Sequence, residues 1–310
     1  RNNSMPVQAL VALLGDSDRY VAFSARRALE KVPTAQWQEQ VLTANDVRIF
    51  LQGSAGLLAI DMSPETAKRI LTRCETILAG DLNAGQSTNR ISDAEFGDTL
   101  RVIELALLRG KIPPAEVPSL TKRILDEYPT KDAILNRELV KLLAYLGPPE
   151  APHALTTQLA SDIPQVEKMQ IAAYAPRLAN GWQTEDKLVM LRFYEDIRGH
   201  EGGHSVSAYI ENFARDFFKN FTLEERRQVL AAGEHYPTSA LSVLAKLPDN
   251  PGPKVYAEIR DLDGRLEGLA GEPVARLRVG IVATLGQSGE PESLAYLRNV
   301  YLNNPARRAP

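Results

Sequence analysis

Apolar residues recur at steps of three and four through nearly all of this 310-residue sequence. That spacing places them on one face of an α-helix, whereas a half-buried strand needs apolar and polar residues to alternate. One continuous helical stripe near the N-terminus is formed by Val21, Ala25, Ala28, Leu29 and Val32. Because alternating stretches are almost absent, we expect an all-α fold.

Residues that begin and end helices punctuate the sequence. Polar residues suited to an N-cap precede apolar segments at Asp18, Ser63 and Thr222. Glycines suited to helix ends follow such segments at Gly110, Gly147 and Gly286. Helices are therefore predicted at roughly 6–14, 19–32, 34–42, 45–60, 63–80, 93–109, 113–127, 130–146, 150–160, 163–179, 183–199, 204–220, 222–234, 237–247, 253–269, 272–286 and 290–302. The short connections predict that successive helices are antiparallel neighbours.

The helical pattern is interrupted at residues 81–92, which have no apolar period. This segment is expected to be a flexible loop or a boundary between N-terminal helices at 1–80 and a continuing helical array at 93–310, all in one continuous domain. Residues 142–147 and 281–286 share a pattern in which an apolar helix end precedes a glycine turn. Helix pairs that repeat in this way bury their apolar faces by stacking, which gives an α-solenoid.

The first 32 residues resemble a HEAT repeat, with an apolar first helix, an Asp-containing turn, and Val, Ala and Ala-Leu along the second helix. The positions that carry this resemblance are Leu10, Leu13, Leu14, Asp16, Asp18, Val21, Ala25, Ala28 and Leu29. The resemblance implies an irregular HEAT-like α-solenoid of antiparallel helix pairs.

A narrower resemblance is carried by residues 18–33, Trp37, 135–139, 180–182, 202–205 and 209–212. These stretches are similar to the helical region of large exported proteins of planctomycetes and their relatives. In that family a sugar-dehydrogenase-like propeller, a HEAT-type helical region and a C-terminal cytochrome c module lie on one chain. The resemblance implies an exported or periplasmic protein whose helical region holds two modules at a fixed separation. Because the chain opens with Arg1 and not Met, we expect a processed product or an excised piece of something longer.

Charge and composition argue against several functions. Thirty-six Lys and Arg against 39 Asp and Glu give a net charge of −3, so the chain lacks the large positive field that holds nucleic acid. Apolar runs such as 139–146 end well before the ~20 residues needed to span a bilayer. The single cysteine, Cys74, excludes disulfide frameworks, and without a Cys-x-x-Cys-His motif the chain cannot attach haem covalently. We expect no cofactor, no nucleic-acid partner and no membrane insertion, with Cys74 as a buried structural thiol.

The sharpest local motif is the H-E-x-x-H formed by His200, Glu201 and His204. In zinc peptidases a helix places both imidazoles toward the metal, and the glutamate acts as general base. Here residues 202–203 are both glycine, and each costs about 1 kcal/mol in a helix interior, which favours a polar loop between two helices. A zinc-dependent hydrolase, with Glu211 as third ligand, stays open as the alternative function.

Aromatic residues gather between positions 193 and 221. One helical stripe, expected to be core, is formed by Ile210, Phe213, Phe217 and Phe221. Phe218 lies off that stripe and, if exposed, would anchor a protein partner. Two histidines isolated from other His and Cys residues are expected at the surface or at helix caps: His153 and His235.

The sequence therefore favours a scaffold and not an enzyme. Stacked helix pairs expose a long concave face made by the second helix of each pair, and such a face binds a protein or a neighbouring module through many modest contacts.

Overall fold

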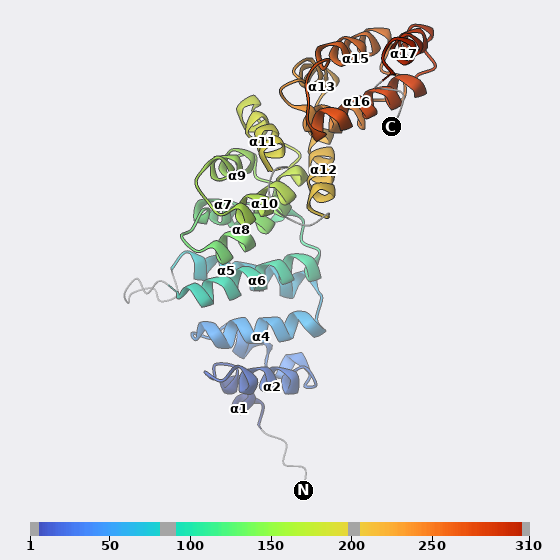
Figure 1. Cartoon of the computed structure of the whole chain (residues 1–310). Helices are drawn as coiled ribbons and strands as arrows, with labels where there is room; N and C mark the ends of the chain where they lie inside the picture. The colour runs from blue at the N-terminus through green and yellow to red at the C-terminus, as the bar shows by residue number, and fades with distance from the viewer. Residues whose placement is uncertain (1–5, 81–90, 198–204, 306–310) are drawn as a thin grey trace. The chain divides into compact units, whose positions relative to one another are not determined.

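The computed structural model describes residues 6–80, 91–197 and 205–305. Within these residues the chain contains the α-helices α1 to α17, a few 3-10 turns and no strand, which confirms the all-α prediction (Figure 1). None of the described helices is long and apolar enough to cross a membrane. The chain divides into two compact units, unit 1 at residues 1–151 and unit 2 at residues 152–310.

Unit 1 is built from eight α-helices in its described residues. They are α1 (Val7–Leu13), α2 (Arg19–Leu29), α3 (Gln38–Leu42), α4 (Val47–Ile60), α5 (Pro64–Leu78), α6 (Asp93–Gly110), α7 (Pro118–Glu127) and α8 (Ala133–Leu146), with 3-10 turns η1 (Thr34–Gln36) and η2 (Pro114–Glu116). The predicted helices at 34–42 and 113–127 are thus each divided into a 3-10 turn and a shorter α-helix.

The helices of unit 1 pack in two rows. The even-numbered helices form one row, in which α2 contacts α4, α4 contacts α6, and α6 contacts α8. In the other row α3 contacts α5 and α5 contacts α7, while the two rows meet in the contacts α1–α2, α3–α4, α5–α6 and α7–α8. Figure 1 shows α2, α4 and α6 in successive layers. Each interior helix is therefore covered on its flanks and on the side of its partner row, and one side remains uncovered.

Unit 2 contains the rest of the helices. They are α9 (Ala151–Ala160), which begins at the last residue of unit 1, α10 (Gln165–Tyr174), η3 (Ala175–Arg177), α11 (Thr184–Asp196), α12 (Ser205–Phe217), η5 (Phe218–Asn220), α13 (Leu223–Ala231), α14 (Pro237–Leu244), α15 (Pro253–Arg265), α16 (Glu272–Gln287) and α17 (Pro291–Asn303). Here α12, α14 and α16 contact one another in order, as do α13, α15 and α17.

The three predicted N-caps are confirmed. The Asp18 carboxylate accepts a hydrogen bond from the Tyr20 backbone N–H at 2.8 Å. The Ser63 hydroxyl accepts one from Thr66 N–H, and Thr222 forms a capping box at the start of α13. These side chains satisfy backbone donors that the first helical turn leaves without partners.

The predicted glycine stops have three different outcomes. Gly147 ends α8 in the left-handed conformation, with φ of 64°. Gly110 is the last residue of α6, but the left-handed position falls on Lys111, with φ of 51°. Gly286 lies inside α16, which continues to Gln287, so the prediction is wrong there. Gly289, with φ of 65°, follows the end of α16.

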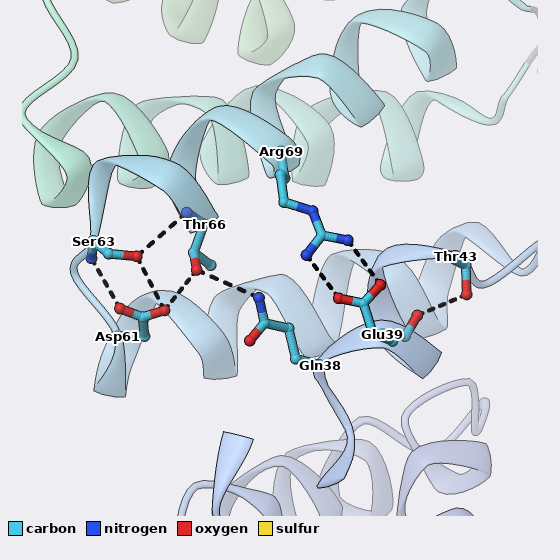
Figure 2. Close-up of polar contacts among 7 residues, drawn as sticks. All are labelled: Gln38, Glu39, Thr43, Asp61, Ser63, Thr66 and Arg69. Carbon is cyan, nitrogen blue, oxygen red and sulfur yellow. Dashed lines mark hydrogen bonds and ion pairs between the residues drawn. The ribbon is translucent and has the colours of Figure 1, made fainter. Parts of the chain in front are cut away.

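Polar contacts join the odd-numbered row of unit 1 between α3 and α5 (Figure 2). Arg69 donates from both terminal nitrogens to the two carboxylate oxygens of Glu39, at 2.7 and 2.8 Å. The Asp61 carboxylate, at the end of α4, accepts hydrogen bonds from the Thr66 hydroxyl at 2.6 Å and the Ser63 backbone N–H at 2.9 Å. These contacts join α5 to α3 through Arg69 and to the end of α4 through Thr66.

Candidate protein-binding face

The large apolar side chains that unit 1 exposes are confined to the even-numbered row. Among the described residues of this unit they are Tyr20 and Phe23 of α2, Ile60 of α4, Met62 just after α4, Leu105 and Leu108 of α6, and Ile134 and Tyr145 of α8. The described parts of α1, α3, α5 and α7 expose none. We call the uncovered side of α2, α4, α6 and α8 the even-helix face.

The exposure on α6 follows from its position between three neighbours. Its buried side chains, such as Leu100, Ile103 and Leu107, pack against α5 and the flanking helices. Arg101, Leu105 and Leu108 are spaced at i, i+4 and i+7, which places them together on the remaining side. Leu108 is 70% exposed, an unusual position for a leucine on a helix that packs on three sides.

Five of these side chains lie at or near the C-terminal ends of α4, α6 and α8. Arg109 Nη1 lies 3.5 Å from Met62 Sδ, which brings the end of α6 beside the end of α4. On the other side, the Tyr145 hydroxyl donates a hydrogen bond to the carbonyl oxygen of Ile112 at 3.1 Å, which brings the end of α8 to the end of α6. We call Ile60, Met62, Leu105, Leu108 and Tyr145 the apolar patch.

A polar cluster borders the apolar patch between α6 and α8. Lys141 Nζ lies 3.2 Å from Glu104 Oε1 and also pairs with Glu138. Burial raises the pKa of the Glu104 carboxyl, and the neighbouring Glu138 adds to this rise while Lys141 opposes it. Burial works against the charge of Lys141, but the two carboxylates outweigh it and raise the Lys141 pKa. One lysine thus pairs with two carboxylates, and the cluster ties α8 to α6 one turn before Tyr145.

Phe218 does not have the exposed position that a partner anchor requires. Its side chain is completely buried, with its ring centroid 4.8 Å from that of Phe221 and 6.0 Å from that of Phe217. The reason is that α12 ends at Phe217, and the 3-10 turn η5 directs Phe218 into the same aromatic cluster. Of the predicted core stripe, Ile210, Phe217 and Phe221 are buried.

The other titratable residues singled out in the sequence lie apart from the even-helix face. His153 is an exposed side chain whose Nδ1 lies 3.1 Å from Oδ1 of the buried Asp186, and His235 is exposed in the turn before α14. Cys74 is completely buried in α5, and burial raises the pKa of its thiol well above the usual value. This supports the expectation of a structural thiol.

The H-E-x-x-H motif falls largely outside the part of the chain that the structure describes. His200, Glu201 and His204 all lie outside it, so the zinc site stays a prediction. Glu211, considered as a third ligand, forms an ion pair with Arg276, with 2.6 Å between Oε1 and Nη2. The described residues contain no cluster of three metal-ligating side chains.

Unit 2 has a hollow of its own, between α14, α16 and residues 247–251. Its volume is about 490 Å³. The lining is mixed in polarity, with Leu241, Leu244 and Ala283 beside Asp249, Thr284 and Gln287.

Comparison with known proteins gives no match. No family model matches the sequence, and no curated protein or solved structure matches it. The two resemblances described above therefore stay predictions.

Proposed function

We propose that this chain is a non-catalytic, HEAT-like scaffold that binds a protein partner through the even-helix face of unit 1. The observation that carries this function is the confinement of all eight large exposed apolar side chains of the described unit 1 to one helix row. Scattered apolar residues are normal on a surface, whereas a gathered apolar patch marks an interaction site.

The packing of the helices supports the HEAT-like part of the proposal. Successive pairs such as α5 and α6 stack so that each even helix contacts the next even helix, and each odd helix from α3 to α7 contacts the next odd helix. The last residue of α6, Gly110, lies against Ala67 in the first turns of α5, as expected for an antiparallel pair. In a solenoid of such pairs the second helices share one extended face.

The contrast between the two rows supports the choice of face. Ion pairs between elements occur in both rows, such as Arg69 with Glu39 in the odd-numbered row and Lys141 with Glu104 in the even-numbered row, but the described odd-numbered helices of unit 1 expose no large apolar side chain. The even row carries Leu105, Leu108 and Tyr145 in water. Covering such side chains contributes about 25 cal/mol for each Å² of apolar area removed from water, so a protein surface is the favoured occupant.

The partner that fits the sequence resemblance is a neighbouring module, either a propeller dehydrogenase or a cytochrome c. The test titrates the purified chain with each module separately and follows binding by calorimetry. We expect a Kd of about 1 μM or lower for at least one module. An absence of binding to both at about 100 μM would contradict the link to these modules.

Matched variants test the face itself. Leu108→Asp places a charge in the apolar patch and should weaken binding by about tenfold or more. Because Leu108 is exposed, no buried contact is lost, and the substitution should cost only about 1 kcal/mol through lower helix propensity and the negative end of the α6 dipole. Thr72→Asp adds the same charge on the exposed side of α5, in the odd-numbered row, and should leave binding unchanged. Equal effects of the two substitutions would argue against the even-helix face.

A further inference from the structure

On the basis of the protein-binding function proposed above, we infer that the apolar patch is occupied by an acidic amphipathic helix of the partner. Three properties of the patch lead to this occupant: the cations at its edge, the helical nature of its walls, and its width.

In the described part of the chain, the cations without an ion-pair partner at the edge of the patch are Arg109 and Lys111, whereas the bordering carboxylates Glu104 and Glu138 are paired with Lys141. Both are exposed, and among the described residues neither has a carboxylate within ion-pair distance. Arg109 contacts Met62, a member of the patch, and Lys111 follows Leu108 by three residues. A partner with carboxylates along one side of its apolar stripe would meet both cations, and complementary charge of this kind sets orientation and partner choice.

The position of Lys111 adds to the charge argument. Its φ of 51° is left-handed, a conformation in which glycine is free of the steric cost that other residues carry. Gly110, one residue earlier, is used for a different purpose, because an added Cβ there would lie 2.3 Å from Ala67 Cβ. Lys111 therefore carries its charge at a position with backbone strain, where the C-terminal end of the α6 dipole also favours a cation.

The walls of the patch favour a helix over an extended segment. α4, α6 and α8 satisfy their own backbone groups, so an extended peptide lying on them would find no row of donors and acceptors to pair with. A helix brings its backbone hydrogen bonds with it and presents only side chains. A phosphate backbone is disfavoured because it would place charge against Leu105, Leu108 and Ile60.

The width of the patch sets the length of the occupant. Neighbouring packed helices lie 8–10 Å apart, so α4, α6 and α8 together span about 16–20 Å between their axes. With a rise of 1.5 Å per residue, a helix of about 11–14 residues crosses that distance. Apolar residues at i, i+4, i+7 and i+11 would contact the patch, with Asp or Glu next to them on the side of Arg109 and Lys111.

The experiment uses the full chain and two labelled peptides of about 15 residues. Both carry Leu at i, i+4, i+7 and i+11 in an Ala-rich helix, and the flanking positions are all Glu in one peptide and all Lys in the other. Binding is followed by fluorescence anisotropy at low salt, where charge effects are largest. We expect the Glu peptide to bind about tenfold more tightly than the Lys peptide.

Three variants and one control, Lys131→Glu, identify the contacts. Arg109→Glu with Lys111→Glu should reverse the preference between the peptides, and Lys131→Glu, at the opposite end of α8, should not. Lys111→Gly removes a charge and relieves the left-handed strain, so it should weaken binding of the Glu peptide while raising Tm, which separates lost recognition from misfolding. Leu108→Asp should weaken the Glu peptide by about tenfold or more and the Lys peptide by less, because the new carboxylate repels the first peptide and attracts the second.

Several results would overturn the inference. Equal binding of the two peptides, or no binding of either, excludes the acidic helix, and the module titration then decides separately whether the face binds protein. If peptide binding is weakened by Leu108→Asp but unchanged by the Arg109 and Lys111 charge reversal, the even-helix face binds a partner, and the partner is not acidic. If duplex DNA displaces the peptide, and its binding is unchanged by Leu108→Asp, then Arg109 and Lys111 bind nucleic acid and the acidic helix is rejected.

Discussion

The close contact between α5 and α6 gives the sharpest test of the helix packing. Gly110 is buried at the end of α6, and a Cβ added to it would lie 2.3 Å from the Cβ of Ala67. Two carbons in van der Waals contact are normally 3.5–4.0 Å apart. Because neither β-carbon can move by rotating a side chain, Gly110→Ala requires the two helix backbones to separate.

The expected cost follows from two opposing effects. Overpacking of a well-packed site costs about 1–3 kcal/mol, and replacing a helical glycine by alanine returns up to about 1 kcal/mol, less at a helix end. Gly110→Ala should therefore destabilise unit 1 by about 1–2 kcal/mol and lower its Tm by roughly 2–8 °C. Ala67→Gly makes room for the new methyl group, so the double variant should be more stable than the sum of the single effects predicts, by about 1–2 kcal/mol.

The assay must follow unit 1 alone. Trp37 is buried in unit 1, and the only other tryptophan, Trp182, lies in unit 2. In a Trp182→Phe background, urea denaturation followed by fluorescence reports on unit 1. Gly97→Ala in α6 is the control within unit 1, because the only atom within 4 Å of its added Cβ is Leu135 Cδ2 at 3.2 Å, the end of a flexible side chain, and the change should be much less destabilising than Gly110→Ala. If Gly110→Ala is as stable as the parent, or if the two single effects add, the α5–α6 packing described here is wrong.

Three further predictions concern polar groups. A hydrogen bond from the Thr66 hydroxyl holds the pKa of Asp61 below its ordinary value, although burial opposes this. The contribution of this carboxylate is therefore complete above its ordinary pKa of about 4 and is lost as pH falls through the lowered pKa. Asp61→Asn should cost about 1–2 kcal/mol in urea denaturation at pH 7 and progressively less as pH falls through the lowered pKa. The Glu195 carboxylate accepts hydrogen bonds from the first turn of α14, including one from Ser239 N–H at 2.8 Å. Glu195→Ala should therefore destabilise unit 2 by about 1–2 kcal/mol, and it should speed hydrogen exchange of the Ser239 amide. A non-catalytic scaffold should retain no zinc after dialysis against a weak chelator, whereas one equivalent that disappears in His204→Ala would favour the hydrolase.

Local sequence signals were sufficient to predict most helices, because most of these segments combine an apolar helical period with an N-cap residue or a terminal glycine. The prediction for 45–60 corresponds to α4 at Val47–Ile60, and the prediction for 93–109 corresponds to α6 at Asp93–Gly110. The signals fail where a helix depends on distant groups. At the start of α14 the N-cap residue, Tyr236, makes no capping hydrogen bond from its side chain, and Glu195 of α11 supplies the acceptor.

Phe218 shows why a helical stripe loses its meaning at a helix end. α12 ends at Phe217 and the 3-10 turn η5 follows, so Phe218 belongs to the turn, where it packs on Phe217 and Phe221, and not to a face of α12. The same change divides the predicted helix at 113–127, where a 3-10 turn at Pro114 precedes α7. Hydrophobic periodicity carries no signal for such a change, so the burial of Phe218 could not be predicted.

The apolar patch could not be found from the sequence for a related reason. α6 is apolar over most of its circumference, with Val102, Ile103, Leu105, Leu107 and Leu108 in a single two-turn stretch. Such a sequence reads as a helix buried on every side, and only the packing shows that α4, α5 and α8 cover three sides and leave Leu105 and Leu108 in water. Apolar side chains that no neighbouring helix covers lower the solubility of the chain. The proposed acidic helix, at the ends of α4, α6 and α8, would cover these exposed side chains of α6.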